Sequence, residues 1–186
     1  MRSFLAIEIK SELKEDILNI QKEFLNENSR IKFVEKENLH LTLKFFGNIN
    51  DKKIKEIESI ITHTLSNYNS FQLNLEKIGV FPNKKHPKVI WIGTHTIDNV
   101  LVKLIKELDK EFNNIGFQKE KSYIPHLTIA RVKYIDNKEK LINTLNKLQN
   151  ISLGNMNITS IKLKSSKLTP NGPIYSTINS FKIEDW

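Results

Sequence analysis

The sequence predicts an α+β fold with antiparallel strand pairing, and three observations indicate it. Strand and helix patterns alternate along the 186 residues. Several strands nevertheless follow one another without the crossover helix that parallel pairing requires. One strand motif, HLTL at positions 40–43, returns as HLTI at positions 126–129. The recurrence indicates a duplicated unit, and such units usually pack about a pseudo-twofold axis.

In the first half of the chain, apolar spacing predicts strands and amphipathic helices in turn. Ser11 is the expected N-cap of the first helix, and Asn50 or Asp51 is that of the second. Three segments suit strands: 3–9, 31–34 and 39–46. The helices are predicted from two apolar stripes, which are Leu13, Ile17, Ile20, Phe24 and Leu25, and then Ile54, Ile57, Ile60, Ile61 and Leu65.

The rest of the chain, from residue 71 on, is read in the same way. A third helix is expected from a stripe that runs from Ile97 to Phe112 and ends near Gly116, and a fourth over 141–148. The strands expected from residue 71 on are 71–81, 89–92, the second motif strand, 158–164 and 174–183. The last two strands flank a predicted turn, Thr169-Pro170-Asn171-Gly172-Pro173.

The two halves agree beyond the tetrapeptide. At the same spacing of 86 residues, INDK at 49–52 aligns with IDNK at 135–138, and both segments lead into a helix. Each half therefore has strand, short turn and capped helix in the same register. We expect one bilobal domain over residues 1–186 with this internal repeat, its motif strands lying near 39–46 and 125–132.

Alternation along a strand decides what each motif presents. His40 and Thr42 share one face of their strand, and His126 and Thr128 share the matching face of theirs. The aliphatic residues between them point to the other face, under a helix. A pseudo-twofold axis would bring the two polar faces together in one cleft.

A single His in a strand is more often a structural residue than a catalytic one. The recurrence of both the His and the Thr at one offset favours a functional site instead. The remaining histidines, His63, His86 and His95, lack this frame, and we interpret them as residues without a catalytic role.

Two imidazoles beside one anion suit paired acid and base catalysis, because an unperturbed His titrates near pH 6.5. One ring takes a proton from the nucleophile and the other delivers one to the leaving oxygen, while Thr hydroxyls steady the developing charge. The chain has no cysteine, and its carboxylates and histidines form no metal-binding pattern. Neither a metal nor a cofactor is expected.

The composition favours an anionic partner. The formal net charge is +8, and the loop 83–88 carries three Lys residues. Without cysteine there are no disulfides. No apolar stretch approaches the roughly 20 residues that cross a bilayer, and the N-terminus lacks a signal-peptide pattern. A cytoplasmic protein with no membrane contact is the expectation.

The paired motifs resemble those of the two-histidine (2H) phosphoesterase superfamily, and within it the RNA 2′,3′-cyclic phosphodiesterases, also named 2′-5′ RNA ligases. The similarity covers essentially the whole chain, including RSFLAIEI, HLTLKFFGNI, VIWIG, PHLTIARVK and SSKLTPNGPIYS. It implies two pseudo-symmetric lobes around a central cleft, each an antiparallel sheet with helices packed outside. It also implies hydrolysis of a terminal 2′,3′-cyclic phosphate on RNA to a 2′-phosphate.

The resemblance also implies roles for five residues. His40 would be the general acid, His126 the general base, Thr42 and Thr128 the phosphate-binding hydroxyls, and Arg131 a further phosphate ligand. Strict alternation places Arg131 on the face of Leu127 and Ile129, away from the cleft. A bulge or a strand end near position 130 would turn it inward.

Three further residues are candidate substrate contacts. By alternation, Lys44 and Phe46 share the face of His40. Lys44 could contact the RNA backbone or simply be solvated, and Phe46 could stack on a base or belong to the core. Tyr123, which precedes the second motif, could likewise stack on a base or belong to the core.

Two other functions stay open at this point. The same cleft could join RNA ends by reversible 2′-5′ ligation, in which a hydroxyl replaces water. The protein could also be a non-catalytic module that binds RNA 3′ ends. The two His and two Thr residues speak against this alternative, because Lys and Arg would be enough for binding alone. The expected partner is an RNA with a 2′,3′-cyclic phosphate end, with tRNA fragments as one source, and the expected state is a monomer.

Overall fold

The computed structural model describes residues 1–25, 28–170 and 172–186. The helices are α1 (Ser11–Lys22), α2 (Asp51–Leu65), α3 (Val100–Asn114) and α4 (Lys138–Leu148), with short 3₁₀ turns at Lys36–Asn38 and Ile97–Asn99. The strands are β1 (Arg2–Glu8), β2 (Arg30–Phe33), β3 (His40–Asn48), β4 (Phe71–Phe81), β5 (Val89–His95), β6 (His126–Tyr134), β7 (Ser152–Ile158), β8 (Ser160–Thr169) and β9 (Gly172–Lys182).

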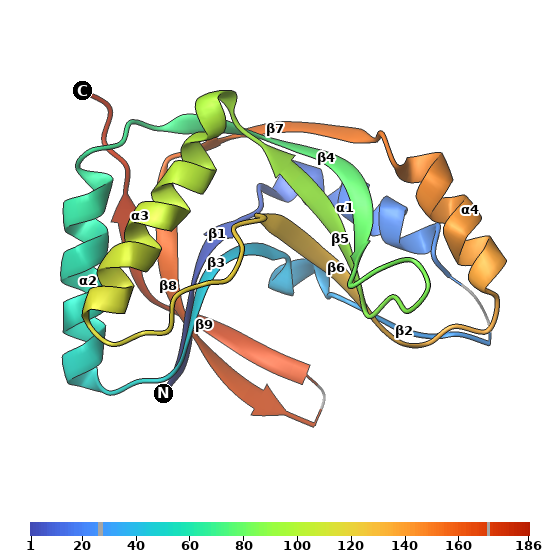
Figure 1. The fold of residues 1–186 in the computed structure, drawn as a ribbon, viewed down its shortest axis with the longest axis horizontal. Coiled ribbons are helices and arrows are strands. Elements are labelled where there is room, and N and C mark those ends of the chain that lie inside the picture. The colour runs from blue at the N-terminus through green and yellow to red at the C-terminus, as the bar shows by residue number, and fades with distance from the viewer. Residues whose placement is uncertain (26–27, 171) are drawn as a thin grey trace.

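The strands form one curled sheet in the order β7-β4-β5-β6-β3-β1-β8-β9, and β2 pairs with β6 beside this path. Every pairing among the described strands is antiparallel. The order is symmetric about the boundary between β3 and β6. The outer neighbour of β3 is β1, and the outer neighbour of β6 is β5; each of these strands comes before its motif strand in the chain. The predicted α+β fold of two pseudo-symmetric lobes is therefore confirmed (Figure 1).

The helices cover the outer side of the sheet, and each lobe takes one helix from each half of the chain (Figure 1). Helix α1 follows β1 but packs against β6 and β7 of the other lobe. Helix α3 follows β5 but packs against β3 and α2. The two halves are thus interleaved, which ties the lobes together on both sides of the boundary.

The two motif strands meet at a single pair, Leu41 of β3 and Leu127 of β6. Both side chains are fully buried, so the contact between the lobes is apolar on the helix-covered side of the sheet. Burying a leucine side chain stabilises the fold by roughly 1.5–3 kcal/mol. The opposite face of the same strands carries the polar motif residues.

Several predicted boundaries need correction. Ser11 is not the N-cap of α1; it is the first helical residue, Lys10 precedes it without a side-chain cap, and the Ser11 hydroxyl bonds Glu12 instead. Asn50 does cap α2, where its side chain accepts from the Lys53 backbone N–H at 2.9 Å. Helix α1 ends at Lys22, before the last two residues of its predicted stripe.

Other differences lie in the second half. Ile97 precedes α3 in a 3₁₀ turn and is 72% exposed, so it is not part of the helix stripe. Strand β7 (Ser152–Ile158) was not predicted, because its SLGNMNI sequence has little apolar alternation. Strands β8 and β9 form the expected hairpin, although Asn171 of the predicted turn lies outside the described residues.

No helix in the described segments is both long and apolar enough to span a membrane.

Gly79 of β4 leaves room for the Trp91 ring of β5. It pairs with Trp91, and a Cβ at position 79 would overlap the six-membered part of the Trp91 ring. We therefore expect Gly79→Ala to push the ring out of place and lower the free energy of unfolding by about 1–3 kcal/mol. Chemical denaturation followed by circular dichroism measures this loss.

The control for this prediction is Gln72→Ala, an exposed substitution in the same strand. It should change the free energy of unfolding by no more than about 0.5 kcal/mol. Equal stability of Gly79→Ala and the parent would contradict the described packing of Trp91.

Candidate active site

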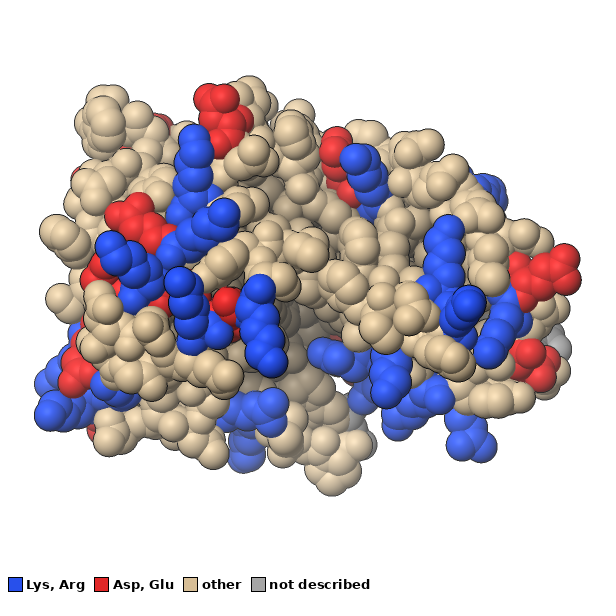
Figure 2. Space-filling view, in the orientation of Figure 1, with Lys and Arg blue, Asp and Glu red and all other residues tan. Residues whose placement is uncertain are grey.

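The polar faces of the two motifs line one cavity of about 420 Å³. This volume falls within the range of roughly 300–1,000 Å³ that small-ligand sites occupy. Among the residues that line it are His40, Thr42, His126, Thr128, Arg131 and Tyr175. Figure 2 shows the hollow between the lobes, with Lys and Arg side chains on both sides of it. The surroundings therefore favour an anionic ligand.

The pairing of β3 with β6 determines how the motif residues face one another. Because the strands are antiparallel and Leu41 pairs with Leu127, the register extended by one residue puts His40 opposite Thr128 and Thr42 opposite His126. The two His positions are then diagonal neighbours, a relation that spans roughly 7–8 Å between strands. Both imidazoles and both Thr side chains line the same cavity.

Both imidazoles make the same hydrogen bond. Nδ1 of His40 lies 2.7 Å from the carbonyl oxygen of Asn38, and Nδ1 of His126 lies 2.7 Å from that of Ile124. A carbonyl oxygen only accepts, so each Nδ1 carries a proton and donates it. The bond orients the ring and leaves Nε2 as the nitrogen that can exchange a proton with a ligand.

His40 is enclosed by aromatic rings. Its ring centroid lies 4.9 Å from that of Phe4 and 5.2 Å from that of Tyr175. Burial lowers the pKa of His40 below its ordinary value, and Lys164 acts in the same direction, while the bond to Asn38 and the charge of Glu8 oppose them. In the protein without ligand, the neutral ring is therefore favoured.

A β-bulge interrupts each motif strand at the same repeat position. In β3 the pairing with β1 skips Leu43, and in β6 the pairing with β5 skips Ile129. A bulge shifts every later side chain to the other face. Phe45 and Arg131, which correspond in the repeat, consequently line the cavity. The bulge that Arg131 requires to face the cleft is thus present.

The bulge in β3 decides between the two alternatives for Phe46, and the structure confirms that it belongs to the core. Phe46 is no base-stacking residue; it is 7% exposed and packs in the core against Phe112 and Phe117. Its neighbour Phe45 is 61% exposed and lines the cavity instead. Adjacent apolar residues, Phe45-Phe46 and Ile129-Ala130, break the alternation near each bulge, but they do not show which residue the neighbouring strand skips.

Lys44 lines the cavity, but it is not solvated, and its ammonium group is bonded to protein partners. The side chain is only 5% exposed. Its Nζ donates to Asp109, to the carbonyl oxygen of Gln118 and to Glu120. An ammonium group has three N–H donors, and these partners occupy all of them.

The ring of Tyr123 lines the cavity, but its hydroxyl points to a protein partner. The hydroxyl donates to Asp109 Oδ2 at 2.7 Å, and this bond raises the pKa of Tyr123 to about 12. A contact between its ring and a substrate stays a prediction. Of the described residues that line the cavity, none is His63, His86 or His95.

The cavity residues that were not singled out from the sequence include three aromatic ones. Tyr175 comes from the β8–β9 hairpin, Phe81 from the end of β4, and Phe45 from the bulged strand. The ring of Phe81 lies 4.9 Å from that of His126, edge to face. Tyr175 and Phe81 lie far from both motifs in the chain, so only the folded sheet brings them to the site.

No group of three or more His, Asp or Glu side chains that could hold a metal ion occurs within residues 1–25, 28–170 and 172–186.

The duplicated motif has a counterpart among known proteins. The model of one family, described as LigT-like phosphoesterase, matches the chain twice, over residues 7–91 and again over 92–175. The chain belongs to the LigT-like phosphoesterase family. The two matches together span both lobes and place one HxT motif in each.

Sequence relatives of this LigT-like phosphoesterase match it almost from end to end. A protein of Methanocaldococcus jannaschii is 46% identical over 97% of this chain and 100% of its own length. A protein of Methanothermobacter thermautotrophicus is 39% identical over 98% of this chain and 99% of its own length. Both are named RNA 2′,3′-cyclic phosphodiesterase.

Solved structures share the fold of the phosphoesterase at lower identity. A protein of Thermus thermophilus, TT0787, has a TM-score of 0.83 at 21% identity, covering 98% of each chain. LigT of E. coli, crystallised with 3′-AMP, has a TM-score of 0.78 at 23% identity, covering 99% of this chain and 98% of its own. These likenesses show that the two-lobed architecture is that of the family.

The charge of Glu8 near His40 leads to a prediction. Glu8 pairs with His40 across β1 and β3 and bonds Lys162 and Lys164, and its own pKa is lowered to about 2. Glu8→Gln removes the negative charge but leaves both lysines. We expect the pKa of His40 to fall further below its ordinary value, because the remaining positive charge disfavours the imidazolium.

Titration of the imidazole Cε1–H signals by NMR measures this pKa. The control is Glu15→Gln, which breaks an exposed pair with Lys36 on the protein surface and should leave His40 unchanged. A His40 pKa that rises, or stays fixed, in Glu8→Gln would contradict the described electrostatics.

Proposed function

We propose that this phosphoesterase hydrolyses the 2′,3′-cyclic phosphate end of RNA to a 2′-phosphate end, without a metal ion. The observation that carries the proposal is the pair of imidazoles, each donating Nδ1–H to the carbonyl oxygen two residues earlier, at one cavity. The names of the relatives that are 39% and 46% identical over nearly the whole chain support it.

The geometry suits an in-line displacement at phosphorus. In the proposed mechanism, Nε2 of His126 takes a proton from water, whose oxygen forms a bond to phosphorus. The bond from phosphorus to the 3′ oxygen breaks, and Nε2–H of His40 protonates that oxygen. The products are a 2′-phosphate and a 3′-hydroxyl. One proton has passed from water to His126, and one has passed from His40 to the 3′ oxygen.

His40 must be an imidazolium to act as the acid, yet burial lowers its pKa. The negative charge of a bound cyclic phosphate opposes this effect, because an anion beside Nε2 favours the protonated ring. Glu8 acts in the same direction. Binding of the substrate would therefore prepare the acid that the reaction consumes.

Three further residues would bind the phosphate. The Thr42 and Thr128 hydroxyls, which line the cavity together with both imidazoles, would donate to its non-bridging oxygens as charge builds on them. Arg131, turned to the cavity by the bulge at Ile129, would pair with the same group.

The same tautomer at both rings favours catalysis over simple binding of RNA ends. A binding module needs positive charge, which Lys and Arg supply, and gains nothing from two rings held with Nε2 toward a ligand. RNA fragments that end in a cyclic phosphate, those of tRNA among them, would be the substrates. A monomer would suffice, since both motifs and Arg131 come from the same chain.

Loss of either imidazole tests the proposal. His40→Ala and His126→Ala should each lower kcat on an RNA with a 2′,3′-cyclic phosphate by about 10²- to 10⁴-fold, because general acid and general base steps contribute on this scale. The double variant should lose little more than the weaker single variant. Chromatographic separation of cyclic, 2′- and 3′-phosphate products gives the rates.

The control is His95→Ala, whose ring is outside the cavity, and it should retain the parent rate. Excess EDTA should also leave the parent rate unchanged. A parent that binds the RNA but does not open its cyclic phosphate would contradict the proposal and favour a binding module. Joined product in the presence of 5′-hydroxyl RNA would instead indicate ligation.

A further inference from the structure

The segment 117–125, between α3 and β6, has no regular secondary structure. It supplies the backbone carbonyl to which the imidazole of His126 is hydrogen-bonded. Glu120, Tyr123 and Ile124 of this segment line the cavity. The carbonyl oxygen of Ile124 accepts the Nδ1–H bond of His126. If the segment moved, the partner that orients the His126 ring would move with it.

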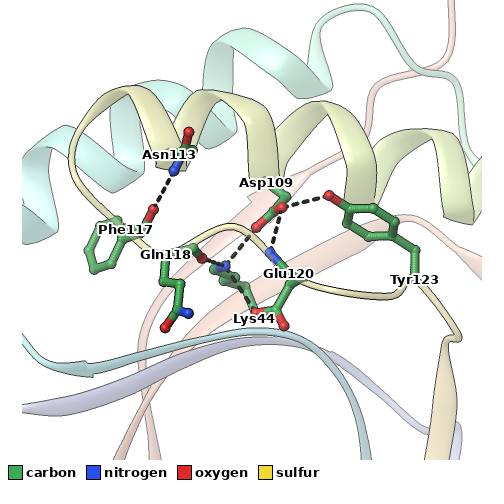
Figure 3. Close-up of polar contacts among 7 residues, drawn as sticks. All are labelled: Lys44, Asp109, Asn113, Phe117, Gln118, Glu120 and Tyr123. Atoms are coloured by element: carbon green, nitrogen blue, oxygen red, sulfur yellow. Dashed lines mark hydrogen bonds and ion pairs between the residues drawn. The ribbon is translucent and has the colours of Figure 1, made fainter.

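A buried ion pair holds this segment (Figure 3). Nζ of Lys44 lies 2.6 Å from Asp109 Oδ1, 2.6 Å from the carbonyl oxygen of Gln118 and 2.9 Å from Glu120 Oε1. The other oxygen of Asp109 accepts from the Glu120 backbone N–H at 3.0 Å and from the Tyr123 hydroxyl at 2.7 Å. Lys44 and Asp109 together thus bond three residues of the segment.

The pair is almost completely removed from water. Asp109 is 1% exposed and Lys44 is 5% exposed. Burial acts to raise the pKa of the Asp109 carboxyl, but the hydrogen bonds from Lys44 and Tyr123 outweigh it and hold that pKa below its ordinary value. Since a buried ion pair often stabilises no more than apolar side chains of similar volume, its value to the protein lies in the geometry that it imposes.

The other half of the molecule uses a neutral side chain for the corresponding task. Gln21, in the last turn of α1 as Asp109 is in the later part of α3, is also buried. Its Nε2 donates to the carbonyl oxygens of Val34 and of Ile129, at 2.8 and 2.9 Å. The ion pair is therefore specific to the segment that leads into His126.

We propose that Lys44 and Asp109 are positioning residues that hold the segment 117–125 and, through the carbonyl oxygen of Ile124, the imidazole of His126. Lys44 reaches Asp109 of α3 because the bulge at Leu43 takes it out of the alternation with His40 and Thr42. The effect on rate rests on the proposed function, whereas the effect on the ring of His126 does not.

The first test removes both charges at once in Lys44→Met/Asp109→Leu, which leaves neither partner buried and unpaired. We expect a folded protein in which the NMR signal of the His126 Nδ1 proton is lost or exchanges faster with solvent. The equivalent signal of His40 should be unchanged and serves as the internal control. On cyclic-phosphate RNA, kcat should fall about tenfold to a hundredfold with KM within about twofold, since a misplaced base affects the reaction more than binding.

A folded variant with a native His126 signal and a parent kcat would overturn the proposal. If the parent itself is inactive, the proposed function fails, and the His126 signal alone still decides the positioning role.

A second pair of variants applies if the double substitution prevents folding. Tyr123→Phe removes a 2.7 Å bond to Asp109, and Tyr68→Phe removes a 2.7 Å bond to Glu107 on the same helix. Only Tyr123→Phe should alter the His126 Nδ1 proton signal and lower kcat. Unchanged His126 signals in Tyr123→Phe, or equal changes in both variants, would overturn the proposal.

Discussion

The candidate site depends on one hydrogen bond that occurs twice: the Nδ1–H of a motif imidazole donates to the backbone carbonyl oxygen two residues earlier. This bond fixes the tautomer as well as the direction of the ring, so Nε2 is the nitrogen that meets a ligand. Alternation then adds a hydroxyl at the second residue after each His. The antiparallel contact at Leu41 and Leu127 brings the two arrangements to one cavity.

The duplication makes the site symmetric in its motif residues. The two imidazoles differ because the residues around them are not duplicated. His40 packs against the rings of Phe4 and Tyr175, and burial lowers its pKa. His126 contacts Phe81 and lies at the end of a segment held by an ion pair. Two rings with the same hydrogen bond but different surroundings are what paired acid and base catalysis requires.

Much of this arrangement could be predicted from the sequence, because local patterns determine it. Apolar periodicity predicted the helices and most strands, and the recurrence of His and Thr at one offset predicted a shared cleft. The bulges at Leu43 and Ile129 could not be predicted from alternation, since a bulge is defined by the pairing with a neighbouring strand. Strict alternation fails at Lys44 and Phe46 because of that omission. The exchange of α1 and α3 between lobes is likewise a tertiary property.

The central claim is that His40 and His126 act on one bound phosphate, and NMR titration with adenosine 2′-monophosphate, a product of the proposed reaction, tests it most directly. The account predicts that the imidazole signals of both residues shift along one binding curve with a single dissociation constant, while those of His63 and His95 stay in place. A response of only one of the two imidazoles, or two separate dissociation constants, would contradict it.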